Sequence, residues 1–469
     1  MEDQAKFTDE GWWASGAVNH FVLGHWNLPG DYNPAAALPV WPYLLGLLFH
    51  FTGVSIVAAR ALNVTLSTAT IGVVYWLVRR TCGFKSATPA IFAALILASS
   101  PFAYAFSRLA ILEPLVIFEF CLALLLASFL TPRRFGLLPA ITLLFCSVIL
   151  TKTTAALLVP AIFWLAWRTM GGKLPSLALC VGVLFAVPAA LCKGYALLVA
   201  KLGYGPDYKY FFDVNAMENI DWARSWTTLV EMFQQGFWVD RTLFPVALAI
   251  LVLSASWKRE LWRNPLFAAS WIALFAQGFF IFTRGEDYAP RYYLAMLVPI
   301  VLIVVLAFAH LVERSRIAAA LLALVMAASV VANTLSTLNY ATHRSYDLQN
   351  AATAIRRTIR DDPKQNPLIL GVNASEISLI TSVPSINDSY SVEDLSAKVA
   401  AYKPGWYLAW DHVPETDAGF LSTYRLEQAG SYPLFDDDER HRLILFRMSP
   451  LAAVDVPPRT TFKPAEQHP

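Results

Sequence analysis

Long apolar runs fill most of the first 340 residues, and they constrain the fold more than any other feature. A membrane-spanning helix needs about 20 mostly apolar residues, because its backbone must satisfy its own hydrogen bonds inside the hydrocarbon layer. Such runs predict spans at residues 55–78, 86–104, 114–130, 137–150, 155–167, 175–199, 242–256, 265–283, 292–310 and 317–335. The apolar run 38–52 contains Pro39 and Pro42, which predicts a broken or interfacial helix. The sequence therefore predicts a polytopic α-helical membrane protein with about 10–11 spans.

The composition supports lipid as the main solvent. Hydrophobic residues make up 57% of the 469 residues and charged residues only 15%, whereas an average soluble domain has about 25% charged residues. The net charge of +2 gives no indication of a nucleic-acid partner. The five cysteines show no Cys-x-x-Cys spacing, so neither a disulfide framework nor a thiolate zinc site is supported.

Lysine and arginine are unevenly divided between the two sets of loops. The cation-rich set includes Arg79, Arg133, Arg168, Lys258 and Arg314, and the positive-inside rule places it in the cytoplasm. The opposite loops, the N-terminal segment and everything after residue 336 are therefore predicted to lie outside. An outward N-terminal segment needs a preceding span for its translocation, which predicts that a helix upstream of Met1 is missing from this sequence.

The composition changes after residue 336, where charged residues, Pro and Gly become frequent. The strand-like runs LILGV, WYLAW and RLILF, with helix-like segments at 374–381 and 391–401, predict a small α/β domain on the outer face. We predict a membrane domain at residues 1–339, an extracytoplasmic α/β domain at 340–456 and a disordered tail at 457–469. Within the membrane domain we expect an outer catalytic loop at 1–54, spans over about 55–335 and a large outer loop at 200–241.

An acidic pair precedes two tryptophans in the segment FTDEGWWASG. Asp9 has a structural interpretation as the N-cap of a helix over residues 10–24, because Asp is a favoured capping residue. Trp12 and Trp13 would then be ordinary aromatics of the membrane interface. The functional interpretation is a carboxylate that faces an outward cavity, beside aromatic rings that offer flat surfaces to a sugar.

Three further outward loops contain charged residues. Arg108 and Glu113 lie at the two ends of SRLAILEP, Lys152 lies in ILTKTTAALLVP, and Arg291 lies in APRYYLAMLVP. Interfacial arginines often reach toward lipid headgroups, so a purely structural role competes with a functional one. Lys152 has no acidic neighbour in sequence, and cations near the membrane interior are candidates for function.

These loops resemble, in the same order, those of a known superfamily. The run DEGWWASGAVNHFVLGHW, followed by YNPAAALPVWPYLLGLLFHFTGVSIVAARALN, resembles the first outer loop of the membrane glycosyltransferases with the GT-C fold. Within that fold it is similar to the dolichyl-phosphate-mannose–protein mannosyltransferase and lipid A aminoarabinose transferase superfamily, and to bacterial members related to glycosyltransferase family 39. SRLAILEP, LTKTTAALLVP and APRYYLAMLVP match later positions, so the resemblance extends from residue 9 to about residue 310.

The resemblance implies an integral membrane transferase of the hexosyl or pentosyl type. Such an enzyme takes one sugar from a polyprenyl-phosphate carrier and passes it to a glycolipid, polysaccharide or protein on the extracytoplasmic face of the inner (plasma) membrane. The acidic residue of the family's first loop falls on Asp9, with Glu10 beside it, and its loop arginine falls on Arg108. Some relatives have an acid and a lysine before a Pro-Pro pair, where this chain reads DYNPA; Lys152 would then compensate.

The chemistry of such a transfer suits these residue types. The leaving phosphate is a stable anion and needs no general acid, unlike the leaving group in glycoside hydrolysis. One base must take the proton of the acceptor hydroxyl, and cations must hold the phosphate charge. Asp9 is the candidate base, Arg108, Lys152 and Arg291 are candidates for the phosphate, and Glu113 is predicted to orient Arg108. A divalent cation would suit the Asp9-Glu10 carboxylates, although two acids are too few to establish a metal site.

Three alternatives differ from this hypothesis in class. A glycan polymerase or ligase would move whole glycans, and acceptor size is not readable from sequence. A lipid or solute transporter predicts charges near the middle of spans, yet the centres of 55–78, 86–104 and 175–199 are almost free of them. A non-catalytic scaffold leaves the ordered charged loops unexplained.

Overall fold

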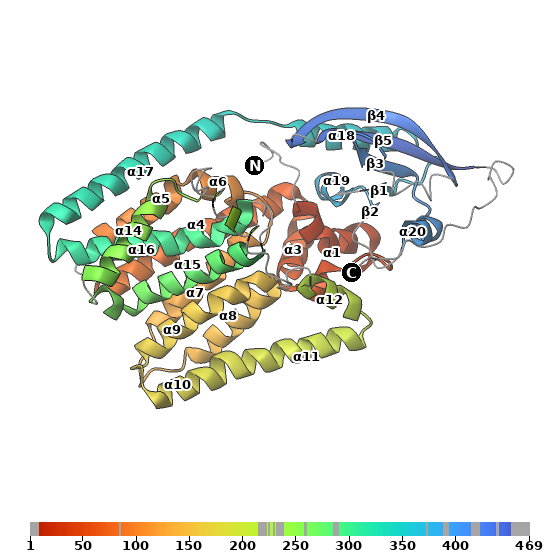
Figure 1. Ribbon diagram of the computed structural model, residues 1–469. Helices are drawn as coiled ribbons and strands as arrows, with labels where there is room; N and C mark the ends of the chain where they lie inside the picture. The colour runs from red at the N-terminus through yellow and green to blue at the C-terminus, as the bar shows by residue number, and fades with distance from the viewer. Residues whose placement is uncertain are drawn as a thin grey trace. The chain divides into compact units, whose positions relative to one another are not determined.

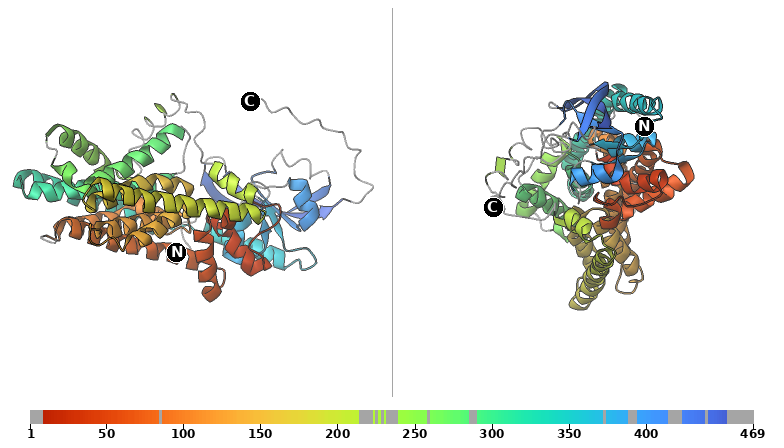
Figure 2. Two further views of the ribbon diagram at one scale, coloured as in Figure 1. Left: turned by 90° about the horizontal axis from the view of Figure 1, so that it is seen from below. Right: turned by 90° about the vertical axis from the view of Figure 1, so that its right-hand side faces the viewer.

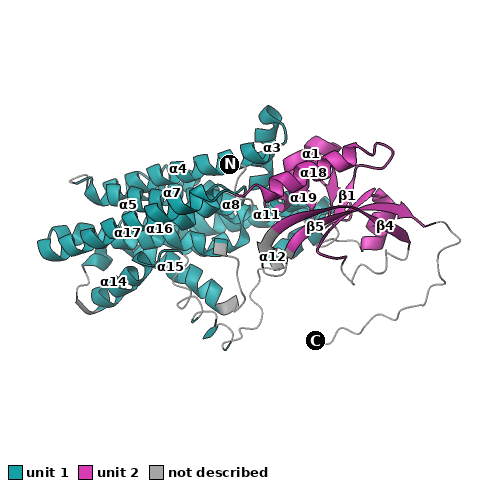
Figure 3. Ribbon diagram, turned by 90° about the horizontal axis from the view of Figure 1, so that it is seen from above, with its two compact units in different colours: residues 1–4, 13–17, 33–344 teal, residues 5–12, 18–32, 345–469 magenta. Residues whose placement is uncertain are grey.

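The structure is a computed structural model, and it divides the chain into two units. It describes residues 9–83, 86–213, 239–257, 260–284, 290–371, 374–387, 394–413, 423–437 and 440–451, with residues 223, 226, 227 and 230 between them. Unit 1 contains residues 13–17 and 33–344. Unit 2 contains residues 9–12, 18–32 and the chain from Ser345 onward (Figure 3). Most of the predicted outer loop 200–241 and the predicted tail 457–469 fall outside the described residues.

Unit 1 is built from helices, and every predicted span coincides with one helix or with two or three consecutive ones. The helices are α2 (Pro34–Ala37), α3 (Val40–Thr52), α4 (Ile56–Thr81), α5 (Thr88–Ser99), α6 (Pro101–Ser107), α7 (Glu113–Ser128), α8 (Leu138–Thr151), η1 (Thr153–Leu158), α9 (Val159–Thr169), α10 (Leu174–Val181), η2 (Gly182–Ala186), α11 (Val187–Lys201), α12 (Gly205–Asp213), α14 (Leu243–Trp257), η3 (Leu261–Arg263), α15 (Pro265–Arg284), η4 (Pro290–Tyr293), α16 (Leu294–Val312) and α17 (Arg316–Thr342). Coloured orange to green, many of them run alongside one another in Figure 1 and in the left view of Figure 2.

Several of these helices have the length and composition of membrane spans. Among the described residues, five helical stretches pass both criteria: residues 56–81, 174–201, 265–282, 291–312 and 316–360. The shorter helices at 40–52, 138–151 and 243–255 are also apolar. The predicted span 86–104 is bent by 60° between α5 and α6. At this bend Ser100 accepts a hydrogen bond from the Ala103 amide, and Pro101 has no amide hydrogen to continue the first helix.

The helix α16 occupies the centre of the unit 1 core. In the apolar stretch of this helix, 72% of the residues are buried. The corresponding shares are 28% in α4 and 17% in the helical stretch at residues 174–201. An apolar surface on every side of a helix is typical of a buried position in a bundle. The helices α5, α14 and α15 pack against α16, and α7 packs against α4, α8 and α9.

Unit 2 contains a five-stranded sheet in the order β2-β1-β3-β5-β4. Its strands are β1 (Ile369–Gly371), β2 (Ser385–Ile386), β3 (Trp406–Trp410), β4 (Tyr424–Asp437) and β5 (Arg440–Pro450). The strand β1 pairs in parallel with β2 and β3, while β5 is antiparallel to β3 and β4. The helices are α18 (Asp347–Arg360), α19 (Ala374–Thr381) and α20 (Leu395–Tyr402). The predicted α/β character is confirmed, while α18, β2 and the long β4 were not predicted.

The two faces of the sheet are covered differently. Along β3, Trp406 and Leu408 face the core made with α18 and α19, whereas Tyr407 and Ala409 face the other side, as the two-residue period of a strand requires. The second face packs against Leu28, which comes from the N-terminal part of the chain. The sheet core therefore includes a residue more than 300 positions away in sequence.

A buried ion pair also ties the N-terminal segment to the sheet of unit 2. Lys398 of α20 is 0% exposed, and its ammonium group contacts the Asp31 carboxylate and the Asn387 carbonyl. The Tyr402 hydroxyl donates to the Pro29 carbonyl at 2.6 Å. The predicted division placed residues 1–54 in the membrane domain, whereas residues 18–32 are part of unit 2. Hydropathy does not reveal this arrangement, because a polar loop that covers a sheet looks like any other polar loop.

Candidate active site

The acidic pair Asp9-Glu10 lies at the start of α1 (Glu10–Leu23), which confirms the predicted helix. Asp9 occupies the N-cap position with φ −78° and ψ 18°, but its side chain makes no capping hydrogen bond. Asp9 therefore has the position of an N-cap residue, but its side chain does not cap the helix. Glu10 is 0% exposed.

Gly11 follows the acidic pair because α1 and α19 of unit 2 approach each other closely at this point. A Cβ atom at Gly11 would lie 2.3 Å from the Glu376 amide nitrogen and 2.3 Å from the Ser375 carbonyl carbon. No side chain fits at such distances, so glycine is required for close backbone approach. The position of the Asp9-Glu10 pair within unit 2 thus depends on the packing of α1 against α19.

The two tryptophans that follow the acidic pair are both half-buried. Trp13 belongs to unit 1, where its ring centroid lies 5.8 Å from that of Phe211 in α12. Trp12 belongs to unit 2. Near the other end of α12, the Asp207 carboxylate accepts a hydrogen bond of 2.6 Å from the Asn33 amide. Burial raises the pKa of Asp207, and the Asn33 hydrogen bond partly opposes this rise.

Three of the predicted site residues form one charged cluster in unit 1. Lys152 Nζ lies 2.5 Å from Glu113 Oε1, and Arg291 Nε lies 3.7 Å from the same oxygen. The Lys152 ammonium group also lies 3.9 Å from the ring centroid of Tyr292. The side chains of Glu113, Lys152 and Arg291 are 8%, 12% and 20% exposed, so two cations share one carboxylate where water has little access.

Electrostatics keep this carboxylate ionised. Glu113 is the first residue of α7 and precedes the apolar run 114–130. Burial raises the pKa of Glu113, but Lys152 and Arg291 lower it by more, so the pKa lies below its ordinary value. The cluster therefore has one negative and two positive charges at neutral pH, and the excess positive charge favours an anion.

Two members of the cluster, Glu113 and Lys152, line a small cavity to which polar side chains from other helices contribute. Glu113, Lys152, Tyr292 and Thr154 line it, together with Gln277 of α15. Gln277 is only 4% exposed. Its amide supplies both a donor and an acceptor next to the charges.

Arg108 lies at the opposite end of the same loop, between two tyrosines. Its guanidinium carbon is 5.3 Å from the ring centroid of Tyr104 and 5.5 Å from that of Tyr340. Arg108 Nη2 donates to the Tyr340 hydroxyl at 3.4 Å, and the residue is 6% exposed. Planar guanidinium groups stack well on aromatic faces and still offer paired donors to phosphate oxygens.

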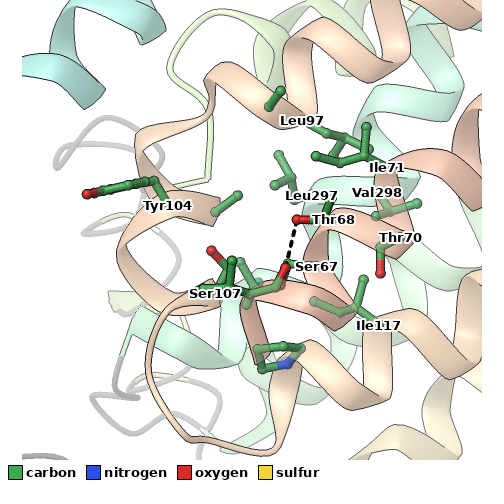
Figure 4. A pocket seen from close by; sticks show the side chains of 15 residues that line it. Ser67, Thr68, Thr70, Ile71, Leu97, Tyr104, Ser107, Ile117, Leu297 and Val298 are labelled. Carbon is green, nitrogen blue, oxygen red and sulfur yellow. Dashed lines mark hydrogen bonds between the residues drawn. The ribbon is translucent and has the colours of Figure 1, made fainter. Parts of the chain in front are cut away.

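A largely apolar cavity of about 150 Å³ is lined in part by Ser107, the residue that precedes Arg108 in sequence (Figure 4). Tyr104 and Ser107 line it, with apolar residues of α4, α5, α7 and α16. Thr68 and Thr70 also line it, but their hydroxyls donate to carbonyls of their own helix. The cavity therefore suits an apolar group.

Asn63 of α4 holds the loop that contains both Arg108 and Glu113. Asn63 Nδ2 donates to the Leu109 carbonyl at 2.6 Å and to the Ile111 carbonyl at 2.8 Å. The Asn63 side chain is 0% exposed, and residues 109–112 are buried as well. One buried amide thus fixes the backbone between the two charged residues.

Sequence reasoning missed several polar residues inside apolar runs. These are Arg60 and Asn63 of α4, Glu119 of α7 and Gln277 of α15, all at most 4% exposed. Their positions within predicted spans could have identified them as candidates, because polar residues are costly in lipid and tend to be functional.

Not every predicted role has the predicted partner. Glu113 was predicted to orient Arg108, whereas its ion pairs in the structure are with Lys152 and Arg291. Among the residues that the structure describes, no group of three or more His, Cys, Asp or Glu residues could hold a metal ion. The divalent cation near Asp9 and Glu10 stays a prediction.

Fold and site together define a multi-pass membrane protein with a buried charged cluster and a small α/β unit. Comparison with solved structures identifies the fold. ArnT from Cupriavidus metallidurans in the apo state matches with a TM-score of 0.61 and 16% identity, over 96% of this chain and 95% of ArnT. ArnT bound to undecaprenyl phosphate matches with a TM-score of 0.61 and 14% identity, over 98% and 96% of the two chains. The chain has the GT-C fold, as its sequence predicts.

Two further comparisons agree with this fold. AglB from Archaeoglobus fulgidus, an archaeal oligosaccharyltransferase in complex with an inhibitory peptide and a dolichol-phosphate, matches with a TM-score of 0.52 and 14% identity, over 88% of this chain and 66% of AglB. The family model for dolichyl-phosphate-mannose-protein mannosyltransferase matches residues 33–191. A search of curated proteins finds no match. The family model thus agrees with the resemblance over residues 33–191, and the structural matches show the fold over most of the chain.

Proposed function

We propose that this protein is a membrane glycosyltransferase that moves a single sugar from a polyprenyl-phosphate donor to an acceptor on the extracytoplasmic face of the inner membrane. The observation that supports it most is the cluster of Lys152 and Arg291 around one buried carboxylate. Two cations with little access to water, and with only one negative charge between them, are suited to a phosphate group.

The donor class is supported by what the structural relatives bind. ArnT has been solved with undecaprenyl phosphate and AglB with a dolichol-phosphate. Both ligands join a phosphate to a long isoprenoid chain. In this protein the apolar cavity lined in part by Ser107 would receive the first part of such a chain, and Arg108, Lys152 and Arg291 would contact the phosphate.

The proposed reaction forms one bond and breaks one. The acceptor hydroxyl oxygen attacks the anomeric carbon of the sugar, and Asp9 takes the hydroxyl proton. The bond between the anomeric carbon and the phosphate oxygen breaks, and its electron pair stays on the polyprenyl phosphate. Cations stabilise the charge that accumulates there, so no general acid is required. The half-buried rings of Trp12 and Trp13 would orient the sugar and the acceptor, whereas Glu10 is fully buried beside Asp9.

Transfer of a labelled sugar tests the base assignment. Purified full-length protein in nanodiscs would be incubated with radiolabelled polyprenyl-phosphate sugars and candidate acceptors. We expect transfer by the wild type and a loss of about 10²-fold or more in Asp9→Asn, since general-base catalysis contributes about 10²–10⁴-fold. Asp361→Asn, which changes an exposed carboxylate, is the matched control. Undiminished transfer by Asp9→Asn rules out the catalytic role.

The phosphate assignment is tested on the donor side. Arg108→Ala should lower donor use by about 10²-fold, if its contact with phosphate strengthens in the transition state. Arg357→Ala removes a cation that is 78% exposed and serves as its control. If both variants respond to donor like the wild type, Arg108 is not part of the site.

The same assay separates the alternative functions. Products enlarged by one sugar support the proposal, whereas products enlarged by several linked sugars indicate a polymerase or ligase. Movement of the lipid-linked sugar across the bilayer without any product would indicate a transporter.

A further inference from the structure

Glu119 is a buried acid that the proposed mechanism does not use. It lies in the middle of the apolar helix α7 and is 4% exposed. An ionisable side chain at such a position is costly in lipid and is usually retained for a function.

Both carboxyl oxygens of Glu119 contact hydroxyl groups of the neighbouring helix α8. Ser147 Oγ donates a hydrogen bond to Oε1, and Thr151 Oγ1 donates to Oε2 at 3.2 Å. Thr151 is 0% exposed, and its single hydroxyl hydrogen is shared between Glu119 and the Ser147 carbonyl, which lies 2.8 Å from Oγ1. Among the described residues, hydroxyls alone contact this carboxyl group, and no cation pairs with it.

The contact point coincides with the end of α8. Thr151 is the last residue of the helix, and Lys152 follows with extended backbone angles, φ −154° and ψ 125°. Its amide still donates to the Val148 carbonyl at 3.1 Å. The direction in which the Lys152 side chain leaves α8 therefore depends on the turn that Glu119 holds.

We propose that Glu119 is a positioning residue for Lys152. Its carboxyl group fixes the last turn of α8 against α7, so that the Lys152 ammonium group meets Glu113 and, in the donor complex, the phosphate. Glu113 and Glu119 both belong to α7, so this one helix contacts the last turn of α8 and the charged end of Lys152. This inference rests on the proposed function, because it assigns Lys152 to the donor phosphate.

Binding of undecaprenyl phosphate to the full-length protein in nanodiscs tests the inference. We expect Glu119→Leu to raise the Kd by roughly tenfold, as for coupled neighbours that share one network. Glu119→Gln should stay within about threefold of the wild type, because an amide accepts from one hydroxyl and donates to the other. Thr151→Val should resemble Glu119→Leu, whereas Thr142→Val removes a buried hydroxyl of the same helix that contacts other groups, and should bind normally.

A double variant separates positioning from a general structural role. In a Lys152→Met background, Glu119→Leu should weaken binding no further. The inference is overturned if Glu119→Leu weakens binding equally in the wild-type and Lys152→Met backgrounds. It is also overturned if the Glu119→Leu protein unfolds at the wild-type temperature and its Kd is unchanged. If Lys152→Met weakens binding and Glu119→Leu does not, only this inference fails. If the wild type does not bind undecaprenyl phosphate, the proposed function fails, and this inference with it.

Discussion

At the scale of single residues, Glu113 shows how a buried acid organises two cations. Removing its charge leaves Lys152 and Arg291 poorly solvated and without their shared carboxylate. Breaking a buried ion pair by removing one partner typically costs about 3–5 kcal/mol. We therefore expect Glu113→Gln to lower the free energy of unfolding by this amount at neutral pH, which thermal unfolding in detergent would measure.

The effect of Glu113→Gln on the free energy of unfolding should depend on pH. The cations lower the folded-state pKa of Glu113 below that of an unfolded glutamate, about 4.3. The unfolded chain then binds more protons in the acidic range, so the stability contributed by Glu113 is present above that unfolded pKa and is lost as the pH falls through the folded pKa. The difference between wild type and Glu113→Gln should shrink below about pH 4. A difference that stays constant from pH 7 to pH 3 contradicts this account.

At the scale of elements, the packing of α1 against α19 depends on the absence of a side chain at Gly11. Gly11→Ala would place a methyl group 2.3 Å from backbone atoms of α19. Backbone atoms cannot rotate away as a side chain can, so we expect a loss of about 1–3 kcal/mol in stability. Sugar transfer should also fall, because the variant displaces Asp9 and Glu10.

Gly72→Ala is the matched control for this element. Gly72 lies in α4, and a Cβ atom there would meet nothing within 4 Å. Alanine has a higher helix propensity than glycine, so this control should be neutral or stabilising by up to about 1 kcal/mol. If thermal unfolding shows the two variants to be equally stable, the close approach of α1 and α19 is not a constraint.

At the scale of the whole molecule, unit 2 is assembled from two distant parts of the chain. Leu28 belongs to the sheet core, and the buried Lys398 pairs with Asp31. Lys398→Met should destabilise unit 2 by about 3–5 kcal/mol, because it leaves the Asp31 carboxylate without its cation. Limited proteolysis within residues 18–32 would report the loosening, and adding Asp31→Asn should restore part of the stability.

An exposed ion pair provides the comparison. Arg357 and Asp361 are 78% and 62% exposed, and such surface pairs contribute about 0–1 kcal/mol. Arg357→Met should therefore leave the proteolysis pattern unchanged. Equal protection of residues 18–32 in Lys398→Met and in the wild type would show that the buried pair does not hold the segment.

The sequence by itself determined the spanning helices and three of the five strands, β1, β3 and β5. Hydropathy located the spans because lipid imposes one requirement on every spanning segment, that its backbone bonds be satisfied within it. The strand WYLAW was found at its observed bounds, since its apolar residues are contiguous. Ordered loop motifs also indicated the GT-C fold and named Glu113, Lys152 and Arg291 as candidates.

Only the tertiary structure decided which of these residues meet. Sequence placed Glu113 with Arg108, its neighbour in the same loop, whereas folding brings it to Lys152 and Arg291 from other segments. Asn63 and Glu119 look like isolated polar residues in apolar runs until the structure shows the carbonyls and hydroxyls they bind. Pairings of this kind depend on helix packing and on distant segments that meet in space, and a one-dimensional pattern of apolar and polar residues does not contain them.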